Sequence, residues 1–127
     1  MISNKKDLLG SRSEDLAVKF LEQYGYKIIQ RNFRCKSGEI DIIAKDKGTL
    51  VFIEVKSRSS IRKSHPYEAI NTVKQKRISR AAVEFAKDNR ILDKKSRFDV
   101  ISVIYSGGMP RLELLKNAFD VRGDFVY

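Results

Sequence analysis

The sequence predicts an α/β fold, a single domain in which a central mixed sheet is flanked by helices. Segments with the helical spacing of apolar residues, 11–24 and 72–89, alternate with segments that show strand-like patterning, 26–34, 38–56 and 97–105. The resulting order is helix, three strands, helix, strand. The last strand follows a helix and is therefore expected to lie parallel to a neighbour. A length of 127 residues suits one such domain, covering residues 1–127, with one hydrophobic core.

The first predicted helix begins at Ser11 or Ser13, after a polar lead-in of residues 1–10. Serine is a favoured N-cap, and Glu14 in the first turn would complement the helix dipole. Gly25 is expected to end the helix in the C′ position. The apolar stripe of this helix comprises Leu16, Ala17, Phe20, Leu21 and Tyr24.

Residues 38–56, GEIDIIAKDKGTLVFIEVK, are predicted to form two strands joined by a tight turn. With Lys47-Gly48 as a two-residue hairpin loop, Asp41 pairs with Glu54, whereas a three-residue loop would put them on opposite faces. In the first register the Cβ atoms of the two acidic residues lie roughly 4.5–5.5 Å apart, where like charges destabilise a sheet. A divalent cation between the carboxylates would remove that penalty.

The two faces of this hairpin differ in character. One face is uniformly apolar, so we expect a helix to cover it: Ile40, Ile42, Ala44, Val51, Ile53 and Val55. The other face is apolar at Ile43, Leu50 and Phe52 and charged at Glu39, Asp41, Glu54 and Lys56. A face that is apolar at one end and charged at the other is typical of a sheet that lines a cleft.

The remaining elements follow from the same patterns. Residues 26–34 have imperfect alternation, which indicates a strand partly covered on both faces, and residues 97–105 predict a central, strongly apolar strand. An edge strand is expected at residues 111–115. The second helix should start at a capping box, Thr72 with Gln75. Its apolar stripe comprises Val73, Ile78, Ala81, Ala82 and Phe85.

A polar, basic loop is predicted at residues 57–66, directly after Lys56, where it would overhang the charged end of the hairpin. It contains the only histidine, His65, which we interpret as solvated rather than as a metal ligand.

Net charge is +10, and nearly all of the excess lies downstream of the hairpin, in residues 56–97. Such a concentration favours a phosphate backbone as the partner. A solubility surface, an anionic membrane or an acidic protein partner would also suit basicity alone. The candidate nucleic-acid contacts are Arg58, Arg62, Lys63, Lys74, Gln75 and Arg77.

The sequence gives fewer indications of the cellular compartment and the oligomeric state than of the fold. No apolar run approaches the ~18–20 residues of a membrane span, and the N-terminal residues lack the apolar segment of a signal peptide. The single cysteine, Cys35, excludes an internal disulfide and fits a reducing compartment, so a cytoplasmic protein is expected. A homodimer is compatible with the sequence, which identifies no dimer surface.

Carboxylates on neighbouring strands are suitable ligands for Mg²⁺ or Mn²⁺, which accept oxygen donors and retain water. Asp41 and Glu54 are therefore the candidate metal ligands. A metal held there would activate water and offset charge on a phosphate. Lys56, two residues beyond Glu54, could orient the attacking water. The predicted chemistry is hydrolysis of a phosphodiester bond.

Asp41 followed by Glu54-Val55-Lys56 resembles the core of the PD-(D/E)xK nuclease superfamily, with its restriction-endonuclease-like αβββαβ fold. Ile40 stands where the name of that superfamily has proline. More closely, the chain resembles the YraN family, UPF0102, over almost its whole length. The resemblance is carried by SEDLAVKFLEQYGYKIIQRNFR, GEIDIIAKD, VFIEVKSRSS, the helix from KQKRI to AA, and RFDVISV.

The resemblance implies a catalytic set of Asp41, Glu54 and Lys56, with Glu14 as the first-helix acid that related Holliday-junction resolvases use near the metal. The first hypothesis for the function is a Mg²⁺- or Mn²⁺-dependent endonuclease that cuts DNA, branched or single-stranded. The competing hypothesis is a non-catalytic nucleic-acid-binding domain that retains the nuclease fold. A protein-interaction module that uses the basic face is a third interpretation, and no feature of its own favours it.

Overall fold

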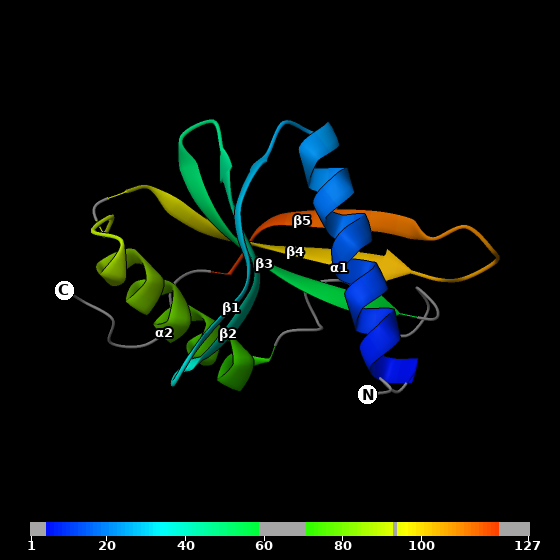
Figure 1. Ribbon diagram of the computed structural model, residues 1–127, viewed down its shortest axis with the longest axis horizontal. Helices are drawn as coiled ribbons and strands as arrows, with labels where there is room; N and C mark the ends of the chain where they lie inside the picture. Colours follow the sequence, from blue (N-terminus) through cyan, green and yellow to red (C-terminus); the bar gives the residue numbers. More distant parts are fainter. Residues whose placement is uncertain (1–4, 59–70, 93, 120–127) are drawn as a thin grey trace.

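The computed structural model describes residues 5–58, 71–92 and 94–119, and within them two helices flank one five-stranded sheet (Figure 1). The sheet has the strand order β1-β2-β3-β4-β5. The elements are α1 (Lys5–Gln23), β1 (Lys27–Cys35), β2 (Gly38–Asp46), β3 (Thr49–Arg58), α2 (Thr72–Asp88), β4 (Ser96–Ile104) and β5 (Arg111–Phe119).

This order confirms the predicted αβββαβ core and its mixed sheet. β4 lies parallel to β3, and the other neighbouring strands are antiparallel. β4 lies inside the sheet, as its apolar sequence predicts, and β5 forms an edge. The predicted edge strand of residues 111–115 is longer in the structure and ends at Phe119. No helix in the described ranges is both long enough and apolar enough to cross a bilayer.

Each helix covers a different face of the sheet, because residues of β2, β3 and β4 alternate between two buried clusters. Ala17 and Leu21 of α1 pack on the face that carries Ile42, Val51 and Ile53. This confirms that a helix covers the apolar face of the hairpin.

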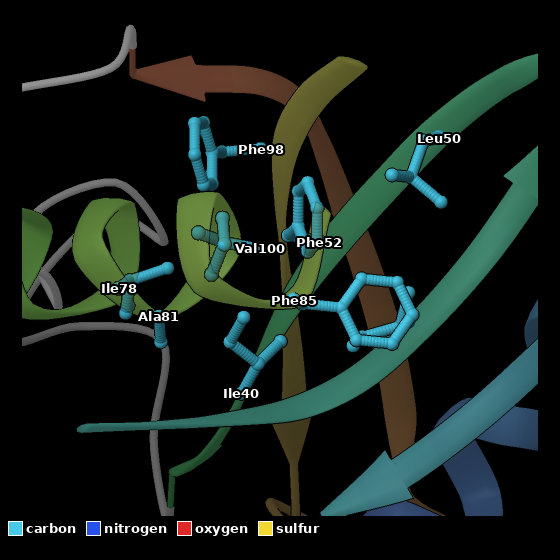
Figure 2. Close-up of a cluster of buried hydrophobic side chains, with 10 residues drawn as sticks. Ile40, Leu50, Phe52, Ile78, Ala81, Phe85, Phe98 and Val100 are labelled. Atoms are coloured by element: carbon cyan, nitrogen blue, oxygen red, sulfur yellow. The ribbon is translucent and has the colours of Figure 1, made fainter. Parts of the chain in front are cut away.

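Side chains of α2 pack on the opposite face, in a cluster that includes Phe52, Phe85 and Phe98 (Figure 2). Phe85 of α2 meets Phe33 and Phe52 edge-on, with ring centroids 5.3 Å and 6.1 Å away. Burial of aromatic rings supplies a large share of core stability. This cluster holds α2 against the sheet beside the charged part of β2 and β3.

The hairpin between β2 and β3 has the predicted two-residue loop. Lys47 and Gly48 have φ values of 50° and 87°, the positive values that a type I′ turn requires. Asp46 pairs with Thr49, and the ladder continues as far as the pair of Ile42 and Ile53. Lys47 shows that a non-glycine residue takes the first of these positions.

Regular pairing of the two strands ends before Asp41 and Glu54. Instead of a ladder bond, the Asp41 carboxylate accepts a hydrogen bond from the backbone N–H of Val55, at 2.8 Å. Ile40 is buried with the α2 cluster, so its predicted place on the face of Ile42 is wrong. Pairing of β2 with β1 continues through this segment as far as Gly38.

Helix α1 begins earlier than predicted, at Lys5, so residues 5–10 of the expected lead-in are helical. Ser13 does not cap the helix, because its buried hydroxyl bonds instead to Ser57 Oγ at 2.5 Å and Tyr105 Oη at 2.8 Å. The predicted end is confirmed, with Gly25 at φ 88°. Tyr24, predicted to belong to the apolar stripe, is 67% exposed.

Helix α2 also differs at its start. Its N-cap is Asn71, whose side chain accepts a hydrogen bond from the backbone N–H of Lys74 at 2.9 Å. The predicted Thr72–Gln75 capping box is therefore wrong by one residue, since asparagine is an equally good cap. Val73, predicted to be apolar and covered, is exposed.

Candidate metal centre

A groove of about 630 Å³ opens where β2 separates from β3, between the strands and the first turns of α2. Asp41 of β2 and Glu54 of β3 lie in it, facing Lys74 of α2. Further lining residues include Arg34, Gly38, Glu39, Asn71 and Arg77. The strands contribute the acids and Arg34, and the helix contributes Lys74 and Arg77.

Asp41 is held in an environment that disfavours its ionised form. Burial, followed by the negative charge of Glu54, raises the pKa of Asp41 to about 8. The hydrogen bond from the Val55 N–H acts in the opposite direction and is the weaker influence. Two acidic side chains placed together in a groove that is partly shielded from water are typical of sites that bind a cation.

Glu54 is the more buried of the two acids, with a side chain only 9% exposed. Its Oε2 forms an ion pair with the Nζ atom of Lys74, one turn into α2. A buried carboxylate needs such a partner, because an isolated charge is strongly destabilising away from water.

Lys56 and Lys74 lie next to each other and respond to their surroundings in opposite ways. Burial and the neighbouring Lys74 ammonium lower the pKa of Lys56. Burial would also lower the pKa of Lys74, but the hydrogen bond and charge of Glu54 outweigh it, so this pKa is raised. Lys74 is thus the lysine that neutralises Glu54, and Lys56 is the less tightly engaged of the two.

Glu14 reaches this centre through its charge rather than through contact. It lies on α1, with Oε1 3.7 Å from the guanidinium of Arg31 in β1. Burial raises the pKa of Glu14, and its negative charge contributes to the raised pKa of Asp41. It does not line the groove.

The predicted nucleic-acid contacts divide into three groups. Lys74 and Arg77 line the groove. Gln75 follows Lys74 on α2, and Arg58 ends β3, where its backbone carbonyl accepts a hydrogen bond from Tyr105 N–H. Arg62 and Lys63 lie outside the described residues, as do His65 and most of the predicted 57–66 loop.

Sequence reasoning missed two features of the groove wall. Arg34 and Glu39 form an exposed ion pair, with Nε and Oε2 3.2 Å apart. Gly38 has a positive φ, and a Cβ added there would lie 3.3 Å from the Cβ of Arg77. The only sequence signals were Gly38 itself and the place of Glu39 on the charged face of the hairpin.

The donor set suits a hard divalent cation. Mg²⁺ commonly binds through one or two carboxylates and keeps several waters, so Asp41 and Glu54 are sufficient protein ligands. Among the described residues no group of three or more histidine, cysteine, aspartate or glutamate side chains could hold a metal ion. A zinc site built from histidine and cysteine would need such a group, whereas a two-carboxylate magnesium site does not.

Comparisons with known proteins point to one family. The sequence profile of the uncharacterised protein family UPF0102 matches residues 13–103. A UPF0102 protein of Geobacter metallireducens is 50% identical over 113 residues, which cover 89% of this chain and 93% of that protein. A UPF0102 protein of Caldicellulosiruptor saccharolyticus is 44% identical over 118 residues, covering 91% and 99%.

Among solved structures, the chain is similar to Pyrococcus furiosus SfsA in complex with Ca²⁺. The TM-score is 0.40 at 15% identity, and the match covers 87% of this chain and 62% of that structure.

Proposed function

The chain belongs to the uncharacterised protein family UPF0102, and we propose that it is a metal-dependent nuclease that hydrolyses phosphodiester bonds in DNA. One observation carries the proposal: two acidic side chains from adjacent strands, Asp41 and Glu54, lie together in a groove whose opposite wall is basic. The charge of Glu54 contributes to the raised pKa of Asp41, a divalent cation would stabilise the ionised pair, and a basic wall favours phosphate.

The acidic residues and the lysine in and near the groove have distinct roles in this proposal. Asp41 and Glu54 would hold Mg²⁺ or Mn²⁺, with Asp41 oriented by the N–H of Val55. When bound, the metal would activate water and offset the charge that grows on the phosphate. Lys56 would orient the attacking water. Glu14, whose charge reaches Asp41, would raise the negative potential of the site.

The basic wall would position the substrate. Lys74 and Arg77 lie on one side of the groove and would contact phosphates, with Gln75 beside them. Arg58, the last residue of β3, and Arg62 and Lys63, which follow it in the sequence, are the further proposed phosphate contacts. Phosphate contacts fix the position of a strand without reading its sequence, which suits a nuclease that recognises branched or single-stranded DNA. A cytoplasmic location, predicted from the single cysteine, belongs to the same proposal.

The test is a cleavage assay on junction, flap, single-stranded and duplex DNA, with Mg²⁺, Mn²⁺ or EDTA. Wild type should cut at least one substrate with metal and none with EDTA. Asp41→Asn and Glu54→Gln keep the shape of the groove and should abolish cutting. Glu113→Gln, on the edge strand β5, is the matched control and should cut like wild type. Cleavage that persists in Asp41→Asn would remove this acid from the proposed site.

A second candidate, a nucleic-acid-binding domain without catalysis, is favoured by the pairing of Glu54 with Lys74. A carboxylate that is already neutralised by a lysine can have a purely structural role. Under this alternative the protein would bind DNA in a salt-dependent manner and cut none of the substrates. Its affinity would then be unchanged by EDTA.

A further inference from the structure

Lys74 occupies the position where a cation is expected. Its ammonium forms an ion pair with Oε2 of Glu54, the more buried of the two acids, although its own side chain remains 36% exposed. Its backbone N–H is bound by the Asn71 N-cap at 2.9 Å, which anchors the start of the helix beside the groove. A long, flexible side chain on a fixed backbone can leave the carboxylate without any movement of the helix.

An ammonium and a divalent cation that bind the same carboxylate repel each other, so each binds more weakly while the other is present. This repulsion between positive charges is stronger in a partly buried groove than in bulk water. Lys56 is a second ammonium next to Lys74, which adds to the positive charge around Glu54. The groove therefore disfavours a free divalent metal while Lys74 remains on Glu54.

We propose that Lys74 is an internal counter-ion that a divalent metal must displace, and that its released ammonium then binds a phosphate of the nucleic acid. The inference rests on the proposed function and adds its regulation: metal and phosphodiester bind together, and each promotes the other. Lys74 is a positioning residue in this scheme, because it acts through Glu54 before the substrate arrives. The partner class is any nucleic-acid strand that places a phosphate in the groove.

Metal binding without nucleic acid tests the first half directly. Mn²⁺ is titrated by electron paramagnetic resonance at about pH 8.5, where acids with ordinary or moderately raised pKa are ionised. Lys74→Met removes the ammonium and should tighten Mn²⁺ binding by about tenfold or more. Lys74→Arg keeps the charge, and Lys76→Met makes the same change on an exposed lysine of α2. Both should bind Mn²⁺ within about twofold of wild type.

The outcomes separate this inference from the proposed function. Mn²⁺ binding that tightens in Lys74→Met, but not in Lys74→Arg or Lys76→Met, supports the inference, whether or not wild type binds measurably. Binding in Lys74→Met that equals or is weaker than wild type overturns it and leaves the metal-dependent function standing. If neither protein binds Mn²⁺, both proposals fail. Lys74→Gln provides a second uncharged variant, so that a folding defect in one substitution does not decide the result.

Coupling between metal and nucleic acid tests the second half. The anisotropy of a labelled single strand of about twelve nucleotides is measured with and without Ca²⁺, and wild type should bind at least about fivefold tighter with the metal. Lys74→Met should lose most of this enhancement, because its metal site no longer competes with a lysine. Equal enhancement in both proteins would overturn the displacement of Lys74.

Discussion

The carboxylate of Asp41 accepts a hydrogen bond of 2.8 Å from the backbone N–H of Val55, the residue that follows Glu54. The last regular pair between β2 and β3 is Ile42 with Ile53, so this side chain satisfies a backbone donor that the ladder has left. Asp41 therefore links β2 to β3 beyond the end of their regular pairing, in addition to its proposed role as a ligand. Substitutions of Asp41 that keep a hydrogen-bond acceptor for the Val55 N–H must therefore be distinguished from substitutions that remove it.

The first prediction concerns stability and pH. Burial and the Glu54 charge raise the Asp41 pKa to about 8 from an ordinary value of 3.8. The folded chain thus keeps a proton that the unfolded chain releases, so this residue should lower the unfolding free energy increasingly as pH rises from about 4 to about 8. Asp41→Asn keeps an acceptor for Val55 but does not titrate. It should melt above wild type at pH 8, with a difference that shrinks towards pH 4.

Circular dichroism melts across this pH range give the measurement, and the difference between the two proteins cancels groups that titrate in both. Asp41→Ala is the control, because it removes the charge and the acceptor together and should be less stable than Asp41→Asn at every pH. Parallel melting profiles for wild type and Asp41→Asn would contradict the raised pKa.

The second prediction concerns metal-dependent stability. A cation that binds only the folded state raises the unfolding free energy by about 2.7 kcal/mol at 100 times its dissociation constant. Mg²⁺ should therefore raise the melting temperature of wild type at pH 8 and have little effect on Glu54→Gln. The rise should be smaller at pH 6, where protons compete for Asp41. Differential scanning fluorimetry measures it, and an equal rise in Glu54→Gln would exclude Glu54 as a ligand.

The third prediction separates a buried polar cluster from the metal centre. Asp99 is 1% exposed and accepts hydrogen bonds from Tyr26 Oη, Arg97 Nε and Asn117 N–H. Asp99→Ala leaves the Arg97 charge without this partner and should destabilise the protein by about 3–5 kcal/mol. Urea denaturation measures the loss.

Asp99→Asn retains an acceptor and should be destabilised less than Asp99→Ala. Neither change should alter Mn²⁺ binding to the protein that remains folded, because Asp99 does not line the groove. A change of less than about 1 kcal/mol in Asp99→Ala would show that the cluster is not important for stability.

The fourth prediction uses two glycines. Gly38 has φ 155°, and a Cβ there would approach the Cβ of Arg77 to 3.3 Å and its carbonyl oxygen to 3.4 Å. Gly38→Ala should destabilise the protein by about 1–3 kcal/mol and shift α2 away from the groove, weakening DNA binding. Gly10→Ala on α1 meets nothing within 4 Å and should stabilise the helix by about 0.5–1 kcal/mol. Melts of both variants would test this contrast, and equal effects would contradict it.

The fifth prediction concerns phosphate contact by Arg77, an exposed residue on the groove wall. Arg77→Gln should weaken DNA binding about equally for all sequences and lower the slope of log affinity against log salt by about 1. Arg90→Gln, at an exposed position beyond the end of α2, is a control that should leave the slope unchanged. An unchanged slope in Arg77→Gln would place the phosphates elsewhere.

Much of the fold was predictable because its signals are local. The Lys47-Gly48 turn, the alternation of β3 side chains between the two faces of the sheet and the Gly25 helix end each depend on a few neighbouring residues, and all three are confirmed. The helix starts were predicted less well. Ser13 was interpreted as a cap, but its hydroxyl bonds to residues that lie far away in the sequence.

The sequence by itself determined the order of elements, the register of the central hairpin and the identity of the acids on its charged face. Tertiary structure decided that pairing ends before Asp41, that Ile40 changes face, and that Lys74 rather than Lys56 pairs with Glu54. The reason is physical. Periodicity and turn chemistry are encoded within one element, whereas burial, the Asp41 pKa and the choice between two lysines depend on how α2 packs across the strands.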